Sequence, residues 1–457
     1  MNILDIHKYL IFKPFDTSTE KGRSDERCRL AALTIIANIF SRAMAMLVMV
    51  LSVSLTIPYL GAERFGVWMT IASFTGMLSF LDLGVGNALT NRVSYIEATK
   101  DRESLKNTIS GGIGFLLIIG LIAGTCLFFL TDILPWEKLI KLNEKTTHYE
   151  IEEAVKIFSI IFGISLYTSG IQKIFAGLQI SYISHIVSLL GSFITVPSLY
   201  IATQHSFDIP KLLLITFGIQ QIVNLILIYI LKKRNLIQLS NIRINTRSEY
   251  KILIGTGGLF LVLQIGTMAG WGLDSLIISS TLGAIQVAKF SVVQKLFQFV
   301  SQPLGIINAP LWGAYANANN IGDRQFIREG LKKSLIMTFT ISALLGFVLV
   351  FNADIIFHYW TDENIKPTMV LLIAFYIWTV IETVGNVFAM FLNGCGIVKE
   401  QVINVIAFTI IVFPIKIYAL KNYDLETMIF VNLATYLIIT IVMYGYMFKN
   451  KINKKLN

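Results

Sequence analysis

The feature that most constrains this chain is a series of apolar runs, each long enough to cross a lipid bilayer as a helix. A helix rises 1.5 Å per residue, so about 20 apolar residues span a hydrocarbon core of ~30 Å. Only 14% of the residues are charged, whereas a soluble domain usually has about 25%. We therefore expect an all-α integral membrane protein with about 12 transmembrane helices and no sizeable soluble domain. Twelve candidate runs cover approximately 31–57, 66–89, 109–130, 156–178, 182–202, 210–231, 252–279, 285–315, 334–352, 368–392, 402–420 and 425–448.

The distribution of basic residues predicts the topology and explains the net charge of +10. If the N-terminus is cytoplasmic, most of the 38 Lys and Arg residues fall in inner loops and tails, as the positive-inside rule expects. An even number of spans then places both termini in the cytoplasm. The basic composition is therefore a topology signal, and no nucleic-acid partner is predicted.

A short pattern occurs twice among the apolar runs. Leu60-Gly61-Ala62 recurs 222 residues later as Leu282-Gly283-Ala284, and Asp101-Arg102 recurs at the same offset as Asp323-Arg324. Asn87-Ala88 recurs as Asn308-Ala309, one residue out of register. A weaker similarity links Phe175–Gln179 with Phe391–Gly396. Two like halves are the plan of many transporters, whose substrate site lies between the halves.

The repeat and the basic segment Lys232-Lys233-Arg234 suggest a division into two lobes. The segment opens the longest inner connection, which separates the sixth span from the seventh. The expected parts are a cytoplasmic tail over 1–30, an N-terminal lobe over 31–231, a cytoplasmic linker over 232–251, a C-terminal lobe over 252–448, and a basic cytoplasmic tail over 449–457.

Arg42 is the deepest charge of the first span. A charge in mid-membrane costs about 2.5–3.5 kcal/mol or more, so it needs a partner, water or a role. Thr34, Asn38 and Arg42 follow a helical spacing of four residues and share one face. We expect this face to line an aqueous cavity that binds substrate. The alternative is a structural ion pair between helices.

The eighth span carries a second polar face with one cation. Ser291, Lys295, Gln298 and Gln302 lie on one helix face by their spacing. We interpret this stripe as cavity-lining and substrate-binding. The glutamines could instead bond to neighbouring helices.

Three acidic residues are candidates for ion coupling, and a transporter of this kind needs no other cofactor. Glu382 lies near the middle of the tenth span, Asp274 in the outer part of the seventh and Asp82 near the inner end of the second. A buried carboxylate can bind and release H+ or Na+ as its surroundings change. Asp82 could instead cap a turn at Gly84 and Gly86. Lys173, Lys289 and Lys416 lie near span ends, where we expect them to snorkel to the interface.

No enzyme or metal motif is present in the sequence. It contains no phosphate-binding Gly-rich loop with its Lys, no His-Glu-x-x-His and no elbow serine, and its histidines are dispersed. Cys28, Cys126 and Cys395 have no ligand spacing and form no disulfide framework. Catalytic and metal-binding residues are therefore not predicted.

Two motifs resemble the polysaccharide-exporter branch of the multidrug/oligosaccharidyl-lipid/polysaccharide (MOP) superfamily, with bacterial O-antigen flippases as the nearest match. The resemblance covers about 29–448. The motifs are Tyr59-Leu60-Gly61-Ala62-Glu63-Arg64-Phe65-Gly66-Val67-Trp68 and Leu81-Asp82-Leu83-Gly84-Val85-Gly86-Asn87.

The resemblance implies two six-helix lobes in a V shape, like the multidrug and toxin extrusion (MATE) transporters of the same superfamily. It implies flipping of an undecaprenyl-diphosphate-linked oligosaccharide from the inner to the outer leaflet of the bacterial cytoplasmic (inner) membrane by alternating access. Membrane lipid, an O-antigen polymerase and a chain-length regulator are the partners it suggests. Arg42 and Lys295 suit an anionic diphosphate by their chemistry, because a guanidinium can bind it bidentately, although neither belongs to a matched motif.

Two other functions compete with flipping of a lipid-linked oligosaccharide. A cation-coupled multidrug antiporter of the same superfamily often carries an acid in its first span, where this chain has Arg42 and no acid. An O-antigen polymerase or ligase typically works in a large outer loop. The longest outer loop, about 131–155, is too short for that.

Overall fold

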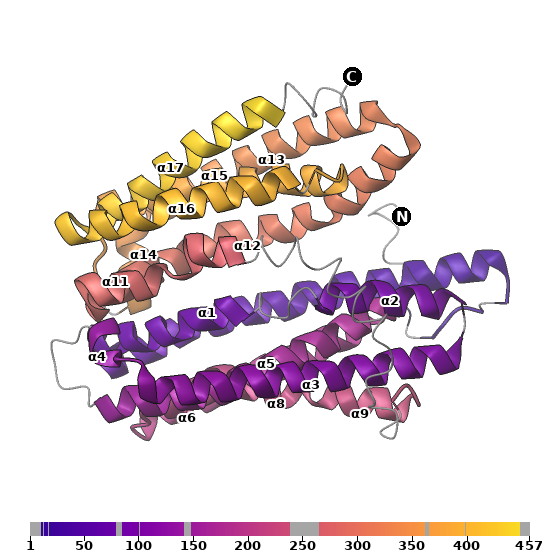
Figure 1. The fold of residues 1–457 in the computed structure, drawn as a ribbon, viewed down its shortest axis with the longest axis horizontal. Helices are drawn as coiled ribbons and strands as arrows, with labels where there is room; N and C mark the ends of the chain where they lie inside the picture. The colour runs from indigo at the N-terminus through magenta and orange to yellow at the C-terminus, as the bar shows by residue number, and fades with distance from the viewer. Residues whose placement is uncertain are drawn as a thin grey trace. The chain divides into compact units, whose positions relative to one another are not determined.

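The chain is helical throughout the residues that the computed structural model describes (Figure 1). These are 11, 13–16, 18–78, 85–99, 101–140, 148–237, 265–361, 365–397 and 399–447. No strand occurs in these ranges. The predicted all-α class is therefore confirmed.

Within these ranges, nine helical segments are long and apolar enough to cross a membrane. The first of them contains the first expected span, 31–57, and the start of the second, 66–89. The seventh expected span lies partly outside the described residues. The eighth is helix α12 (Ala284–Ile321), whose 38 residues include the polar stripe. The arrangement is consistent with about 12 transmembrane helices. The nine segments are Cys28–Ser73, Arg102–Ile133, Tyr149–Gly177, Ser181–Gln204, Ile209–Lys233, Arg324–Phe351, Met369–Gly394, Lys399–Asn422 and Leu425–Met443.

The chain forms two compact units, and the division is not a single cut along the sequence. Unit 1 consists of Met1–Leu55, Thr75–Leu134 and Thr147–Leu261. Unit 2 consists of Thr56–Phe74, Pro135–Thr146 and Val262–Asn457. Two short segments of the N-terminal half therefore belong to unit 2. Most of the expected linker, 232–251, lies outside the described residues, so its role stays a prediction.

Unit 1 is built around helices α3 and α5, which approach closely because glycines line their contact. A Cβ built on Gly120 would lie 2.4 Å from the carbonyl oxygen of Gly163, and one on Gly124 would lie 3.3 Å from the Cα of Gly163. Small residues four apart allow helix backbones to meet in this way. The helices of this unit are α1 (Glu20–Leu78, which continues into unit 2), α2 (Val85–Thr99), α3 (Arg102–Ile133), α5 (His148–Gly177), α6 (Ser181–Gln204), α7 (Ile209–Leu213), the π-helical turn η2 (Leu214–Gly218), α8 (Ile219–Asn224) and α9 (Ile226–Lys233).

Unit 2 has its core where α12 packs on the helices that follow it. Tyr315 is fully buried against Phe391, with ring centroids 5.9 Å apart, and its hydroxyl lies 3.2 Å from the Ser334 hydroxyl. Gly394 leaves room for the Tyr315 side chain. Besides α12, this unit contains α4 (Trp136–Leu139), the π-helical turn η4 (Met268–Gly272), α11 (Asp274–Leu282), α13 (Arg324–Phe351), α14 (Ala353–Thr361), α15 (Met369–Gly394), α16 (Lys399–Asn422) and α17 (Leu425–Met447).

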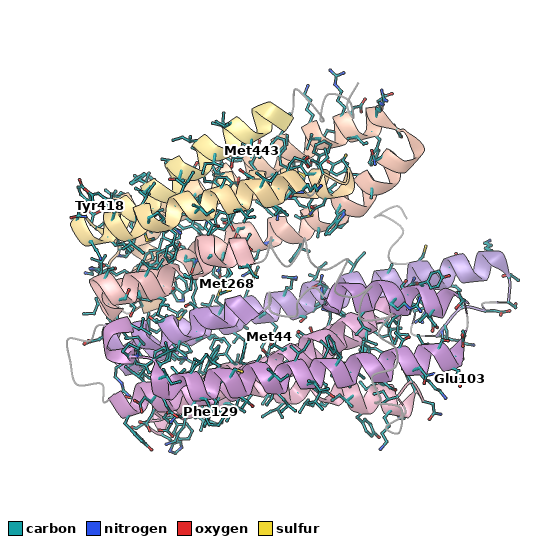
Figure 2. The ribbon with its side chains drawn as sticks, viewed as in Figure 1. Met44, Glu103, Phe129, Met268, Tyr418 and Met443 are labelled. Atoms are coloured by element: carbon teal, nitrogen blue, oxygen red, sulfur yellow. The ribbon has the colours of Figure 1, made fainter. Side chains whose placement is uncertain are left out.

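Both units expose large apolar side chains, as expected for surfaces that contact lipid. Figure 2 shows Phe129 on α3 and Tyr418 on α16, each 62% exposed. A soluble protein rarely exposes contiguous apolar patches of large area. The outer faces of the long helices therefore suit a bilayer better than water.

The internal repeat predicted from the sequence has the same backbone geometry in both copies. Gly61 interrupts α1 with φ 72° and ψ 167°, and Gly283 separates α11 from α12 with φ 90° and ψ 170°. This region of backbone conformation is almost restricted to glycine. Asp101 caps α3 by accepting from the Ser104 amide at 3.1 Å, and Asp323 caps α13 by accepting from the Phe326 amide at 2.9 Å. In each half of the sequence, the repeated glycine therefore interrupts a helix and the repeated aspartate caps the N-terminus of one.

The weaker similarity near Phe175 has a more general origin. Backbone bonds Ile180 N to Phe175 O and Ile397 N to Leu392 O close two equivalent helix ends. These bonds make Phe175 equivalent to Leu392. The same type of helix end occurs at Asn235, which has a positive φ. Residues in the left-handed backbone conformation commonly terminate helices. This similarity adds little to the repeat.

Candidate substrate and ion sites

Arg42 and Asn38 lie one turn apart on α1, within unit 1. The Arg42 Nε donates to the Asn38 Oδ1 at 3.1 Å, and the Arg42 side chain is exposed. Within the described part of the chain, Arg42 forms no ion pair with a carboxylate. The alternative of a structural ion pair is therefore not observed there, and the guanidinium keeps donors for a ligand. Its role in substrate binding stays a prediction.

Lys295 lies in unit 2 against two aromatic rings from α1. Its Nζ is 5.9 Å from the ring centroid of Phe65 and 5.7 Å from that of Trp68, and both rings are fully buried. A cation over an aromatic face gains about 0.5–2 kcal/mol, depending on its desolvation. The described residues place no carboxylate in an ion pair with Lys295, whose side chain is half-buried. Its positive charge is thus held by rings and not cancelled.

The other members of the α12 stripe lie where the helical spacing predicted them. Ser291 is buried, whereas Gln298 and Gln302 are half-buried. Neither glutamine side chain bonds to a neighbouring helix among the residues described. Whether the stripe binds substrate remains a prediction.

Asp274 forms a buried ion pair with Lys416 inside unit 2. The Lys416 Nζ lies 2.6 Å from Asp274 Oδ1 and also donates to the carbonyl oxygen of Gly270. Lys416 is fully buried and Asp274 is 5% exposed. The expectation that Lys416 snorkels to the interface is therefore wrong. Residue 416 is near a span end along the chain, but the paired carboxylate draws its ammonium inward.

The π-helical turn η4 brings the Gly270 carbonyl to this ion pair. Such turns leave backbone groups free for other partners and are frequent at functional sites. Trp271, in the same turn, stacks on Phe408 with centroids 4.6 Å apart and meets Tyr436 edge-on at 6.0 Å. Aromatic rings from α16 and α17 thus pack against η4.

The remaining acidic candidates differ in their surroundings. Glu382 on α15 is exposed and forms no ion pair within the described ranges. Asp82 lies outside the described residues. Of the two candidates in the described residues, Glu382 is therefore without an ion pair, while the charge of Asp274 is neutralised by Lys416.

Unit 1 also contains a cavity that the sequence analysis did not predict. Its volume is about 380 Å³. None of the described residues that line it is charged. The reasoning from sequence followed charges and missed it, although Ser165, Thr168 and Gln172 recur at helical spacing within one apolar run. The lining residues are Ser41, Ala45, Ile161, Ser165, Thr168, Ser169, Gln172, Ser188, Ser192, Phe217, Gln220, Gln221 and Asn224.

Two units rich in membrane-length helices, with the glycine break at Gly61 repeated at Gly283, form a fold that is shared by membrane transporters of the MOP superfamily. The likeness to solved structures supports this fold. An inward-facing multidrug resistance MATE transporter superposes with a TM-score of 0.75 at 14% identity, covering 91% of this chain and 99% of that one. A MOP superfamily transporter from Pyrococcus furiosus gives 0.68 at 14% identity, covering 92% and 94%.

The family follows from the sequence comparison. A family model described as polysaccharide biosynthesis protein matches residues 28–312, and the MatE model matches residues 262–418. The chain belongs to the polysaccharide biosynthesis protein family, in the flippase branch of the MOP superfamily. It is a transporter and not an enzyme.

Similar proteins carry names that agree with this assignment. One from Yersinia pseudotuberculosis, described as an O-antigen export protein, is 22% identical over 91% of this chain and 94% of its own length. One from Salmonella typhi, described as an O-antigen transporter, is 24% identical over 55% of this chain and 56% of its own length.

Proposed function

We propose that this transporter flips an undecaprenyl-diphosphate-linked O-antigen or related repeat unit from the inner to the outer leaflet of the bacterial cytoplasmic membrane. The names of the similar proteins point to this cargo. The observation that carries the proposal is the cation Arg42, which lies within a membrane-length helix and has no carboxylate partner among the described residues.

The chemistry of Arg42 fits a diphosphate better than a cationic drug. A guanidinium can bind two phosphate oxygens with parallel hydrogen bonds, and such charge-assisted bonds are about twice as strong as neutral ones. Lys295 supplies a second cation in unit 2. Each of these cations would attract an anionic headgroup and repel a cationic drug, since opposite charges attract and like charges repel.

The multidrug antiporter is the weaker alternative. From Cys28 to Leu60, α1 contains Arg29 and Arg42 but no acidic residue. A cationic drug or a coupling ion would lack a counter-charge in this segment. The likeness to multidrug transporters concerns the fold alone, because its sequence identity is 14%.

Alternating access by this transporter would be coupled to an ion gradient, with Glu382 as the coupling residue. Its carboxylate is free of ion pairs in the described structure, so H+ or Na+ can neutralise it. Asp274 is less suited, because Lys416 already neutralises it at 2.6 Å. An O-antigen polymerase and a chain-length regulator would use the flipped product in the outer leaflet.

Reconstitution tests this function directly. Purified protein is reconstituted into liposomes together with the lipid-linked repeat unit. This lipid is extracted from cells that lack the transporter. Appearance of the sugar in the opposite leaflet is followed with a lectin or a glycosidase that cannot cross the bilayer. We expect flipping well above that of protein-free liposomes. A rate equal to the protein-free control, with transport of a cationic dye by the same vesicles, would instead establish the antiporter.

A further inference from the structure

The uncharged cavity of unit 1 is a built site and not a packing defect. Five elements supply its wall: α1 with Ser41 and Ala45, α5 with a longer face, α6 with Ser188 and Ser192, and then η2 and α8. Empty cavities in proteins are usually apolar. Ten hydroxyl and amide side chains around one space therefore indicate a polar occupant.

The polar lining is held in position by its own hydrogen bonds. Thr168 Oγ1 donates to Gln221 Oε1 at 2.5 Å, and Gln220 Nε2 donates to Asn224 Oδ1 at 3.2 Å. Thr168 is fully buried and Asn224 is 3% exposed. Each bond leaves one or more donors or acceptors of the amides unused. The wall is thus preorganised and still able to bond to a ligand.

The backbone around the cavity is adapted to this wall. Gly191 on α6 has no side chain where a Cβ would lie 2.5 Å from the Oε1 of Gln220. The π-helical turn η2 comes directly before α8 and sets the direction in which Gln220 and Gln221 project. Inserted π turns are often found at functional sites.

The chemistry of the lining selects among possible occupants. No side chain in it carries a charge, so neither a phosphate nor a metal ion would find a counter-charge there. Hydroxyls and amides match a ligand that both donates and accepts, and Phe217 offers an apolar face to ring carbons. A volume of about 380 Å³ lies within the ~300–1,000 Å³ of small-molecule sites. A sugar has these properties.

We infer that this cavity binds uncharged sugar residues of the translocated repeat unit, an inference that rests on the proposed function. Ser41 lines the cavity, and Arg42 is the next residue on α1. One substrate could thus place its sugar in the cavity and its diphosphate at Arg42. Recognition would be divided between a neutral pocket and a cation within unit 1.

Binding measurements on the full chain in lipid nanodiscs test the division. Two probes are used: the lipid-linked repeat unit from cells lacking this chain, and undecaprenyl diphosphate without sugar. Thr168→Val removes a cavity hydroxyl without changing the shape. We expect it to weaken binding of the glycosylated lipid about tenfold, as for the loss of one or two buried hydrogen bonds, and to leave the sugar-free lipid unaffected. Gln172→Met should give the same pattern.

Two further variants make the outcome decisive. Thr195→Val is the matched control, because Thr195 is buried on α6, bonds only to the Gly191 carbonyl at 2.9 Å and does not line the cavity. It should bind both probes like wild type. Arg42→Ala should weaken both probes.

The remaining outcomes overturn the inference. If Thr168→Val and Gln172→Met bind the glycosylated lipid like Thr195→Val, or if they weaken both probes equally, the cavity does not bind sugar. A wild-type protein that binds neither probe better than phosphatidylglycerol would refute the proposed function itself, which is a different result from loss of sugar discrimination.

Discussion

At the scale of single residues, the cations of this membrane protein have three different environments. Arg42 is exposed and bonds to an amide oxygen, Lys295 lies over aromatic rings, and Lys416 is neutralised by Asp274. Only a cation whose charge is not cancelled can attract an anionic ligand strongly. Arg42 and Lys295 are therefore suited to substrate, and Lys416 to structure.

Replacing either uncancelled cation should impair transport and leave the protein folded. We expect Arg42→Ala and Lys295→Ala to lower the flipping rate by about tenfold or more, since a charge-assisted bond contributes about 1.5–3 kcal/mol. Protein level on a blot and surface polysaccharide on a gel provide the measurement in cells. Lys333→Ala is the matched control, because Lys333 is 80% exposed in a long surface pair with Glu329. Full complementation by both alanine variants would remove Arg42 and Lys295 from the transport path.

The ion pair between Asp274 and Lys416 should affect stability chiefly when only one of its two members is removed. Removing one member leaves a buried charge and costs about 3–5 kcal/mol, whereas removing both costs far less. We expect Asp274→Ala to lower the melting temperature of the purified protein strongly and Asp274→Ala with Lys416→Met to recover most of it. Trp271, in the adjacent turn, makes tryptophan fluorescence a suitable readout. Equal melting of the single and double variants would show that the pair is not coupled.

At the scale of helices, the repeated glycines fix where membrane segments change direction. A Cβ on Gly61 would meet no atom within 4 Å, so only its backbone conformation demands glycine. Gly283 has the same conformation at the equivalent place, between α11 and α12. Both halves of the sequence therefore interrupt a helix with a glycine in the same backbone conformation.

Alanine at these breaks should therefore destabilise the protein through the backbone alone. We expect Gly61→Ala and Gly283→Ala each to cost about 1–3 kcal/mol, the range for residues held in sparsely populated backbone regions. The controls are Gly111→Ala and Gly305→Ala, which lie inside α3 and α12 with no atom within 4 Å of the added Cβ. These should be neutral or stabilising, because alanine favours a helix over glycine by about 1 kcal/mol. Thermal unfolding in detergent measures all four, and equal melting of both sets would contradict the argument.

At the scale of the whole molecule, the proposed coupling of transport to an ion gradient centres on Glu382. This acid forms no ion pair within the described structure. A proton or sodium ion that neutralises it would change the charge carried by unit 2 during the cycle. In the proposed cycle, coupling therefore depends on one carboxylate of α15.

Removal of that carboxylate should abolish the response to the gradient. We expect a pH gradient to stimulate flipping by the wild type several-fold, and Glu382→Gln to flip at the same rate with and without it. Asp354→Asn is the control, because Asp354 is an exposed acid on α14. A sodium gradient in place of the pH gradient identifies the ion. A Glu382→Gln protein that still responds to the gradient would exclude this residue.

Much of the fold could be predicted from the sequence, and much less of the candidate site. The helices, their lengths and the equivalent positions of Gly61 and Gly283 follow from runs and motifs that are contiguous in the chain. Arg42 and Asn38 are bonded as their spacing of four residues suggested. The cavity of unit 1 was missed, because its wall comes from several helices and its described lining contains no charge.

Hydrophobic length and helix-breaking residues act locally, so the sequence alone determined a polytopic helical protein with an internal repeat and a cation in its first span. The tertiary structure decided which side chains meet. Lys416 and Asp274 are 142 residues apart, and the rings that hold Lys295 come from a segment that precedes it by more than two hundred residues. The reason is that a helix presents every direction to its surroundings, and only packing against other helices selects the direction that each side chain takes.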